Sequence, residues 1–193
     1  ATKEDYETFG RVLTPQIELY DKTCGIFGLG AIGFAFAKMA QGFGMRVISY
    51  SRHKKTDPKY DFIEQVDFDT LLAESDVISI HAPLTPSTED TFDADAFAKM
   101  KDGTILINTA RGGLIVEEAL VDALQSGKVY GAGLDVIRDE PPKGDNPLLH
   151  QDNAAITAHI AWLTRASRLR AIDIAIDNFK AYLRGEPVSV INK

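Results

Sequence analysis

Three polar side chains that could carry proton and charge chemistry follow three separate apolar segments of the chain: Arg111, Glu140 and His159. An arginine close to a reacting oxygen stabilises the negative charge that develops there. A histidine can donate or accept a proton near neutral pH, and a neighbouring carboxylate favours its charged form. If the segments are parallel strands, the three side chains meet at one sheet edge, where open α/β sheets bind their ligands.

Each of these residues also has a purely structural interpretation. Arg111 could cap the end of its strand or pair with an acid, and Glu140 could be a surface acid beside two prolines. His159 could be a hydrogen-bonded structural histidine. Taken singly, these interpretations are at least as good as the chemical one. The occurrence of all three residues, in one order at three strand ends, favours a chemical site.

A glycine-rich segment lies near the start of the chain, where Gly28, Gly30 and Gly33 follow an apolar run and open a helical one. In that context the first glycine permits a tight turn and the second lets the backbone approach a pyrophosphate. The third allows close helix–strand packing. The first helical residues, Ala31 and Ile32, offer free N–H groups to the phosphates. We therefore predict a dinucleotide site, with a glycine turn that binds no ligand as the alternative.

The end of the second predicted strand bears on which dinucleotide is bound. NAD sites usually carry an Asp or Glu there to hold the ribose 2′-hydroxyl. This chain has Ser51 and Arg52 instead, followed by His53, Lys54 and Lys55. A serine and an arginine could accept a 2′-phosphate, which a carboxylate would repel. The sequence favours NADP(H), while NAD(H) stays possible and a solvated basic turn is the alternative without a phosphate.

The elements that must position these residues follow from the apolar runs. Most runs are continuous rather than alternating, which is typical of parallel strands buried on both faces. The predicted strands are Thr23–Phe27, Arg46–Tyr50, Val77–His81, Thr104–Asn108, Val129–Asp135 and Ala155–Thr157.

Helical patterns lie between the predicted strands. In the longest of them, Leu169, Ile172, Ile176 and Phe179 form one apolar stripe. The alternation of strand and helix predicts a doubly wound α/β fold, a Rossmann-like three-layer α/β/α arrangement around a parallel sheet. The predicted helices are Ala31–Gly42, Asp69–Glu74, Asp93–Met100, Val116–Gln125 and Thr164–Leu183.

Composition narrows the functional classes. The chain has 193 residues and a formal net charge of −7, which makes it a poor partner for nucleic acid or an anionic membrane surface. Its one cysteine, Cys24, excludes an internal disulfide. No His, Asp or Glu grouping has metal-ligand spacing, so no metal is predicted. Without a long apolar run or a signal peptide, a cytoplasmic protein is expected.

Six motifs occur in one order and at matching spacing: Gly28–Gly33, His81–Thr85, Asn108–Leu114, Gly133–Val136, Asp139–Pro142 and His159–Trp162. With these motifs the chain resembles the nucleotide-binding domain of the NAD(P)-dependent D-isomer-specific 2-hydroxyacid dehydrogenases. The resemblance extends from about Tyr20 to Asn192. The last motif is most similar to the glycerate dehydrogenase, or hydroxypyruvate/glyoxylate reductase, branch.

The resemblance implies reversible hydride transfer between nicotinamide and a small 2-oxo or 2-hydroxy acid, with hydroxypyruvate or glyoxylate as the expected substrate. It implies that Arg111 binds the carboxylate and carbonyl of the acid. His159 would exchange a proton with the carbonyl oxygen, Glu140 would hydrogen-bond the imidazole, and Asp135 would hold the nicotinamide carboxamide. Hydride addition builds negative charge on oxygen, so a cation and a proton donor there suit the reaction. A homodimer is also implied.

The cofactor site expected from the motifs and the resemblance combines the glycine-rich segment, the basic turn and the ends of the later strands. Its residues are Gly28, Gly30, Ala31, Ile32, Gly33, Ser51, Arg52, His81, Ala82, Pro83, Thr88, Thr109, Ala110, Arg111, Asp135, His159 and Ala161.

The expected organisation is an N-terminal arm at residues 1–20 and a dinucleotide-binding domain at residues 21–193. The family's separate substrate domain is expected to be absent from this chain. Closure of two domains normally excludes water, so the chain alone should bind cofactor and turn over slowly or not at all. A non-catalytic dinucleotide-binding module, or a redox-sensing interaction domain, is the alternative function. A different Rossmann enzyme, such as an adenosylhomocysteine hydrolase, would lack this Arg/Glu/His order.

Overall fold

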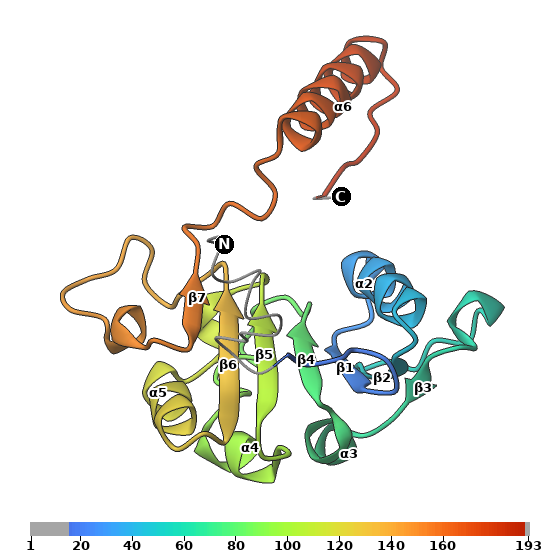
Figure 1. Ribbon diagram of the computed structural model, residues 1–193. Coiled ribbons are helices and arrows are strands. Elements are labelled where there is room, and N and C mark those ends of the chain that lie inside the picture. The colour runs from blue at the N-terminus through green and yellow to red at the C-terminus, as the bar shows by residue number, and fades with distance from the viewer. Residues whose placement is uncertain (1–15, 192–193) are drawn as a thin grey trace, which may run out of the picture.

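Parallel strands form one sheet at the centre of the computed structural model, which describes residues 16–191 (Figure 1). The strands are β1 (Thr23–Phe27), β2 (Arg46–Tyr50), β3 (Glu64–Gln65), β4 (Val77–Ile80), β5 (Thr104–Asn108), β6 (Val129–Leu134) and β7 (Ala154–Ile156). They lie in the order β3-β2-β1-β4-β5-β6-β7, and every neighbouring pair is parallel. The order reverses at β1, which is the switch point where doubly wound sheets bind ligands. The predicted Rossmann-like fold is confirmed.

Helices connect the strands. They are α2 (Ala31–Gly42), α3 (Phe68–Glu74), α4 (Ala94–Lys99), α5 (Glu117–Gln125) and α6 (Arg165–Leu183), with short 3-10 turns η1 (Pro58–Tyr60), η2 (Gly112–Leu114) and η3 (Pro147–His150). In the described part of the chain, no helix is both long and apolar enough to cross a membrane. Residues 1–15 of the expected arm, and residues 192–193, lie outside the described residues.

The predicted elements are confirmed to within one residue at each end, and side-chain capping explains two of the differences. Asp93 and Thr164, predicted as first helical residues, are the N-caps of α4 and α6. Their side chains accept backbone N–H groups of Ala96 at 2.9 Å and of Ser167 at 3.1 Å. Such bonds satisfy amides that have no partner within the helix.

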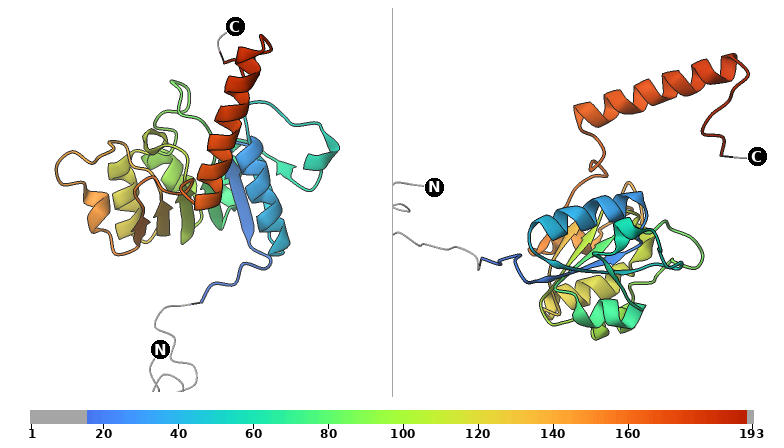
Figure 2. Two further views of the ribbon diagram at one scale, coloured as in Figure 1. Left: turned by 90° about the horizontal axis from the view of Figure 1, so that it is seen from above. Right: turned by 90° about the vertical axis from the view of Figure 1, so that its right-hand side faces the viewer.

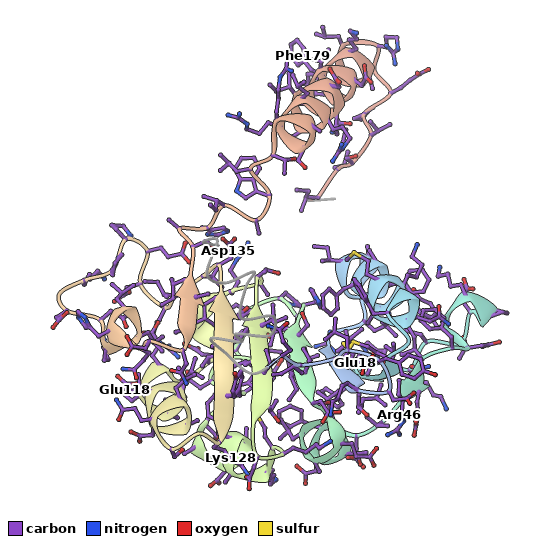
Figure 3. All side chains as sticks on the ribbon, in the orientation of Figure 1. Glu18, Arg46, Glu118, Lys128, Asp135 and Phe179 are labelled. Atoms are coloured by element: carbon purple, nitrogen blue, oxygen red, sulfur yellow. The ribbon has the colours of Figure 1, made fainter. Side chains whose placement is uncertain are left out.

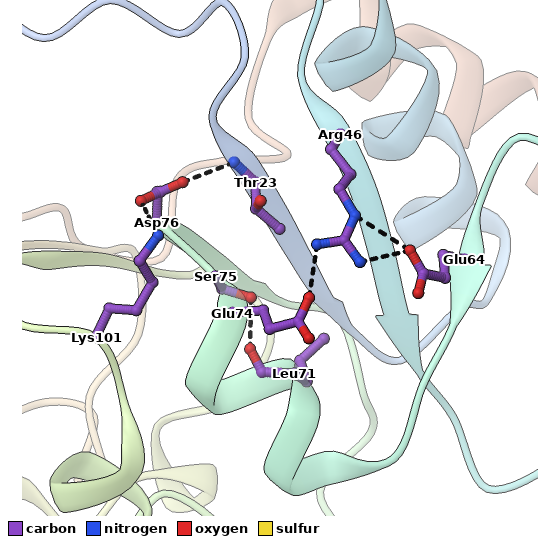
Figure 4. A network of polar contacts seen from close by, with 8 residues as sticks. All are labelled: Thr23, Arg46, Glu64, Leu71, Glu74, Ser75, Asp76 and Lys101. Atoms are coloured by element: carbon purple, nitrogen blue, oxygen red, sulfur yellow. Dashed lines mark hydrogen bonds and ion pairs between the residues drawn. The ribbon is translucent and has the colours of Figure 1, made fainter.

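The strand β3 was not predicted, because two polar residues give no periodic signal. It forms at the sheet edge by pairing Ser49 of β2 with Gln65. An exposed ion-pair cluster supports it: Arg46 contacts Glu64 of β3 at 2.5 Å and Glu74 of α3 at 2.6 Å (Figure 4). Exposed pairs of this kind contribute little stability individually, so pairing with β2 remains the main reason for the strand.

Two apolar cores lie on opposite faces of the sheet. Figure 2 shows α2 over one face, with α3, α4 and α5 below the other. On the α3–α5 side, the ring of Phe27 packs against those of Phe68 and Phe92 at centroid distances of 5.5 and 5.1 Å. On the α2 side, Ile26 and Ala37 are fully buried in the second core. The glycine-rich turn between β1 and α2 is therefore anchored from both faces.

The sheet is not buried evenly, which corrects the prediction of strands buried on both faces. Every residue of β1 and β4 is buried, whereas β5 alternates between buried and partly exposed residues and half of the residues of β6 are partly or fully exposed. The side chains of Ile105 and Ile107 in β5 are only half-buried against the α2-side core. The outer strands are thus more open on the α2 side than their continuous apolar sequence suggested.

The C-terminal helix α6 stands apart from the sheet (Figures 1 and 2). Its predicted apolar stripe exists, yet Leu169, Ile172 and Phe179 are 51, 55 and 62% exposed. Figure 3 shows Phe179 far from the strands. The predicted helix is confirmed, but its apolar stripe is not covered by the sheet in the described arrangement, because periodicity identifies an apolar face and not the surface that covers it.

The amino ends of the strands are held by a separate polar network, also drawn in Figure 4. Asp76 accepts the backbone N–H of Thr23 at 2.8 Å and contacts Lys101 at 2.6 Å. Burial alone would raise the pKa of Asp76. The bonds from Lys101 and Thr23 lower it by more, so the net pKa lies below its usual value. Figure 3 shows Lys128 at this end of β6 and Asp135 at the other, where the candidate site lies.

Candidate active site

Two glycines of the turn between β1 and α2 are required by the fold itself. Gly28 has a φ of +99°, and a Cβ there would lie 2.7 Å from the backbone nitrogen of Ala82. A Cβ at Gly33 would lie 2.3 Å from the carbonyl oxygen of Gly28. A side chain at Gly28 would therefore collide with the backbone after β4, and one at Gly33 would push α2 away from the turn. Both roles agree with the prediction.

The second glycine of the motif has no such reason within the described residues. A Cβ at Gly30 would meet no heavy atom within 4 Å, so the space in front of it is open. Gly30 is the N-cap of α2 and provides no side-chain cap to the helix. The N–H groups of Ala31, Ile32 and Gly33 thus keep their capacity to bind an anion. An open approach to uncapped amides fits a pyrophosphate.

A cleft of about 440 Å³ opens beside this turn. It lies at the carboxyl ends of β1, β2 and β4, the position expected for a dinucleotide. Its walls are Phe27, Gly28, Leu29, Gly30, Tyr50, Ser51, Arg52, His53, Lys55, Phe68, Ala82, Pro83, Thr85, Ser87, Thr88 and Thr91. Predicted cofactor residues from three separate segments are therefore brought to one hollow.

The lining of this cleft is cationic at the end of β2. Arg52 and Lys55 contribute the positive charges, His53 lies beside them in the wall, and none of the described lining residues is Asp or Glu. The hydroxyl of Ser51 donates a hydrogen bond to the carbonyl oxygen of His53 at 3.0 Å, which tightens the turn. The acid that holds a ribose 2′-hydroxyl in NAD sites is thus missing from the described walls as well as from the sequence position.

His81, predicted in the cofactor site, does not line the cleft. Its Nε2 lies 2.9 Å from the hydroxyl oxygen of Ser79, and its ring packs on Phe36 at a centroid distance of 5.2 Å. Burial lowers the pKa of His81 to about 4, so the ring is neutral at physiological pH. The following residues, Ala82 and Pro83, line the cleft as predicted.

Thr88 lines the cleft with its hydroxyl already engaged. The hydroxyl donates to the carbonyl oxygen of Pro83 at 2.7 Å and accepts the backbone N–H of Thr85 at 2.8 Å. These bonds close a compact turn after β4. Thr88 therefore shapes the wall of the cleft through this turn, and a direct bond from it to a cofactor stays a prediction.

The candidate acid–base pair is assembled between the ends of two neighbouring strands. Nδ1 of His159, after β7, lies 2.7 Å from Oε2 of Glu140, in the loop after β6. The other carboxylate oxygen, Oε1, accepts the backbone N–H of Ile137 at 3.2 Å. The bond to Nδ1 orients the ring and leaves Nε2 for a reacting group. Both side chains are partly exposed, at 41 and 35%.

Asp135 holds the backbone that carries His159. Its side chain accepts the hydroxyl of Thr157 at 2.5 Å and the N–H groups of Ile160 and Ala161 at 2.8 Å each. Burial raises the pKa of Asp135, but the bonds from Thr157, Ala161 and Ile160 lower it more, so the net pKa lies below its usual value. His159 has a φ of +55°, a conformation that ordinary residues adopt only when surrounding bonds enforce it.

Arg111 lies at the end of β5, beside β6. Its guanidinium donates to the carbonyl oxygen of the preceding Ala110 at 2.6 Å, so it does not contact His159 or Glu140 in this arrangement. Asn108 brackets the turn: its side chain donates to the carbonyl of Arg111 and accepts the N–H of Ala110, both at 2.9 Å. The structure brings Glu140 and His159 together and leaves Arg111 at the same sheet edge.

A shallow hollow at the ends of β5, β6 and β7 contains three more of the predicted residues. Thr109, Asp135 and Ala161 line it. A second cavity, of about 440 Å³, is lined by Glu140 and His159. Among residues 16–191 there is no group of three His, Cys, Asp or Glu residues that could hold a metal ion. A metal-free site stays a prediction.

The sequence interpretation missed several residues that build the site. Asn108 and Thr157 lie directly at strand ends, and Glu117 opens α5. Strand-end amides and hydroxyls are a signal for such roles, because they can bond the turn that follows. Glu117 gave no sequence signal beyond its charge near a helix N-terminus. Its partners, the backbone of Arg138 and the side chain of Asn146, lie in the distant loop that carries Glu140.

The geometry agrees with a comparison to known protein families. The model of the D-isomer specific 2-hydroxyacid dehydrogenase, NAD binding domain, matches residues 4–161. The chain belongs to this family. A hydroxypyruvate reductase of Blautia hydrogenotrophica is 51% identical over 179 residues, which cover 93% of this chain and 56% of the relative. The expected family and branch are confirmed, and the chain spans about half the length of the curated relatives it matches.

Solved structures that are similar to this chain show the same fold. The chain matches a D-lactate dehydrogenase with NAD⁺ from Lactobacillus jensenii with a TM-score of 0.86 and 32% identity, over 99% of this chain and 62% of that one. It matches an acyclic imino acid reductase in complex with NADPH and D-Arg with a TM-score of 0.85 and 34% identity, over 98 and 61%. Dinucleotide binding is thus a family property, and both cofactors occur among similar structures.

Proposed function

We propose that this chain is the cofactor-binding half of an NAD(P)-dependent 2-hydroxyacid dehydrogenase, and that its own residues supply the acid–base group. The observation that carries the proposal is the 2.7 Å contact between His159 and Glu140, at the same sheet edge as the open glycine turn. When bound, the nicotinamide cofactor supplies or accepts the hydride. Gly28, Gly30 and the first turn of α2 would hold its pyrophosphate.

The side chains divide the remaining work. His159 donates a proton from Nε2 to the carbonyl oxygen during reduction and takes it back during oxidation. Glu140 stabilises the charged ring and holds its orientation through Nδ1. Arg111 binds the substrate carboxylate, because its planar guanidinium matches a carboxylate with two parallel bonds. For this role it must swing away from the Ala110 carbonyl.

The proposed substrate is a small 2-oxo acid, hydroxypyruvate or glyoxylate. The name of the Blautia relative supports hydroxypyruvate. A carbonyl beside a carboxylate presents the two groups that a cation and a proton donor can bind together. Asp135 is proposed to accept the nicotinamide carboxamide with lone pairs left over from its bonds to the His159 segment.

The proposed cofactor preference is NADP(H) over NAD(H). Arg52 and Lys55 line a cleft whose described walls contain no carboxylate. Neither cation forms an ion pair with a residue in the described range. A 2′-phosphate carries up to two negative charges, so unpaired cations favour it and a missing acid removes repulsion.

A second candidate is a dinucleotide-binding module that does not turn over. The partial exposure of Glu140 and His159 favours it, because an acid–base pair works best where water is excluded. Under the enzyme proposal this exposure predicts slow turnover, whereas the second candidate predicts none.

A homodimer in a reducing, cytoplasmic compartment completes the proposal. The outer face of α2 supports self-association, since Ile32, Met39 and Phe43 are 71, 56 and 62% exposed and lie at helical spacing. The single cysteine, Cys24, is free and buried, which suits a reducing compartment. Sedimentation equilibrium of the chain should give twice the mass of one chain, and a monomer would contradict the dimer.

The test of the proposal is a pair of fluorescence titrations with NADPH and NADH. Both cofactors should bind, NADPH more tightly, and Gly30→Val should abolish binding of both by filling the open approach. Addition of hydroxypyruvate should then oxidise NADPH. Failure to bind either cofactor would contradict the cofactor site, whereas binding without oxidation would favour the module.

A further inference from the structure

The basic turn after β2 is held to the sheet edge by one side chain. The amide of Gln65, in β3, makes two bonds with the backbone of Lys55: its Oε1 accepts the Lys55 N–H at 2.7 Å, and its Nε2 donates to the Lys55 carbonyl oxygen at 2.8 Å. An amide that pairs both ways with one residue imitates a rung of a β-ladder. The Gln65 amide thus holds the backbone of Lys55 with the same pair of bonds that a neighbouring strand would provide.

This clamp fixes the far end of the turn. The near end is fixed at Tyr50, whose carbonyl oxygen accepts the N–H of Gly28 at 2.9 Å. Between them, Ser51 bonds to the His53 carbonyl oxygen at 3.0 Å. The turn therefore has anchors at both ends and one internal bond, and Lys55 is both the clamped residue and part of the cleft wall.

Clamping has a direct consequence for a phosphate on the ribose. A lysine or arginine on an unanchored turn pays side-chain and backbone entropy when it binds an anion. A turn held in the binding conformation avoids this cost, since apparent affinity scales with the fraction of molecules in the competent state. Of the two cofactors only NADP(H) carries this phosphate, so loosening of the turn should weaken binding of NADPH more than binding of NADH.

We propose that Gln65 is a positioning residue for cofactor choice: by clamping Lys55 it holds the Ser51–Lys55 turn ready for a 2′-phosphate. Gln65 does not touch the cofactor. Its action passes through the backbone of Lys55 to the cations of the turn. The inference rests on the proposed preference for NADP(H), and it adds a residue from the edge strand β3, whose formation the sequence did not indicate.

The test compares Gln65→Met with the unchanged chain in parallel titrations with NADPH and NADH. Methionine keeps the length and shape of the side chain and removes both bonds to Lys55. The dissociation constant for NADPH should rise about fivefold to tenfold, while that for NADH should change less than twofold. An equal change for both cofactors, or a change for neither, would overturn the role of Gln65.

Two controls make the result specific. Glu64→Gln alters the neighbouring residue of β3 and its contact with Arg46, and it should leave the NADPH-to-NADH ratio unchanged. In an Arg52→Ala background, Gln65→Met should change the ratio less than it does in the unchanged chain, because the two residues act on one phosphate site. Equal effects in the two backgrounds would contradict action through the turn.

Hydrogen exchange supplies a readout that needs no cofactor. The Lys55 amide should exchange more slowly than the Lys54 amide in the unchanged chain and lose this protection in Gln65→Met. An unprotected Lys55 amide in the unchanged chain would show that the clamp does not form. If the unchanged chain prefers NADH, the cofactor proposal fails and this inference fails with it. If the unchanged chain prefers NADPH and the NADPH-to-NADH ratio is the same in Gln65→Met, only the role of Gln65 fails.

Discussion

His159 and Glu140 lie 19 residues apart, yet Nδ1 of the imidazole and Oε2 of the carboxylate are separated by 2.7 Å. The pairing of β6 with β7 makes this possible, because it brings the ends of two parallel strands together. The strand register places the histidine after β7, and Asp135 then fixes its backbone through the N–H groups of Ile160 and Ala161. The acid–base pair is thus a product of sheet topology and of one buried carboxylate.

The substitution His159→Gln separates binding from chemistry. Glutamine keeps a polar side chain but cannot exchange a proton at neutral pH, so oxidation of NADPH by hydroxypyruvate should fall at least about 100-fold. Cofactor affinity should stay within about twofold, because the glycine turn and the basic turn are untouched. Stopped assays and fluorescence titration measure the two quantities. Undiminished oxidation in the variant would remove His159 from the mechanism.

The loop that carries Glu140 depends on Glu117 of α5. One oxygen of the Glu117 carboxylate accepts the backbone N–H of Arg138 at 2.7 Å, and the other accepts the side-chain amide of Asn146 at 2.9 Å. The same carboxylate therefore closes both ends of the loop around Glu140.

Glu117→Gln should lower the free energy of unfolding by about 1–3 kcal/mol, since an amide cannot accept both donors at once. For a chain of this size the melting temperature should fall by about 2–4 °C per kcal/mol. Calorimetry measures the shift. Glu118→Gln is the matched control, because Glu118 is its exposed neighbour on the same first turn and its substitution should leave the melting temperature nearly unchanged. Equal shifts in the two variants would mean that the loop bonds contribute nothing.

Local sequence predicted most of the fold because buried parallel strands and capped helices leave local signals. The run Thr23–Phe27 contains no charged residue, and the strand it predicts is buried throughout. The strand β3 was not predicted, because Glu64 and Gln65 form a strand only by pairing with the edge of β2. The position of α6 was not predicted either, since an apolar stripe such as the one that contains Ile172 does not identify the surface it packs against.

The candidate site was predictable where one residue does one local task, as Gly28 does with its positive φ. It was not predictable where a side chain bonds a distant backbone. Gln65 and Lys55 are 10 residues apart, and Glu117 and Asn146 are 29 apart. Such pairs depend on tertiary geometry, which motifs do not encode. His81 shows the reverse case, because its place in a motif suggested a cofactor contact and its ring is buried against Phe36.

Burial of His81 makes stability depend on pH in a defined window. Burial lowers its pKa to about 4 from the ordinary value of 6.5, so the unfolded chain binds more protons between these values. The stabilising contribution of the neutral ring is present above pH 6.5 and is lost as the pH falls toward 4. Urea unfolding at several pH values measures it.

The variant His81→Gln should lose this dependence. The stability difference between the unchanged chain and the variant should shrink by about 2–3 kcal/mol between pH 7 and pH 4.5. His53→Gln, at an exposed histidine of the basic turn, is the control and should keep the pH dependence of the unchanged chain. A constant difference for His81→Gln across this range would show that the ring is not held neutral.

Cys24 provides a reporter of unfolding, since it is the one cysteine of the chain. Its side chain is 1% exposed on β1, and burial raises the pKa of its thiol to about 12. Because the thiolate is the reactive form, only about one molecule in 10⁴ carries it at pH 8, and a reagent must also reach a buried strand. The native chain should therefore react with a disulfide reagent several orders of magnitude more slowly than the chain in urea. Absorbance at pH 8 measures both rates, and Cys24→Ala gives the blank. If the thiol of the native chain reacts as fast as that of the unfolded chain, Cys24 is not buried in the native fold.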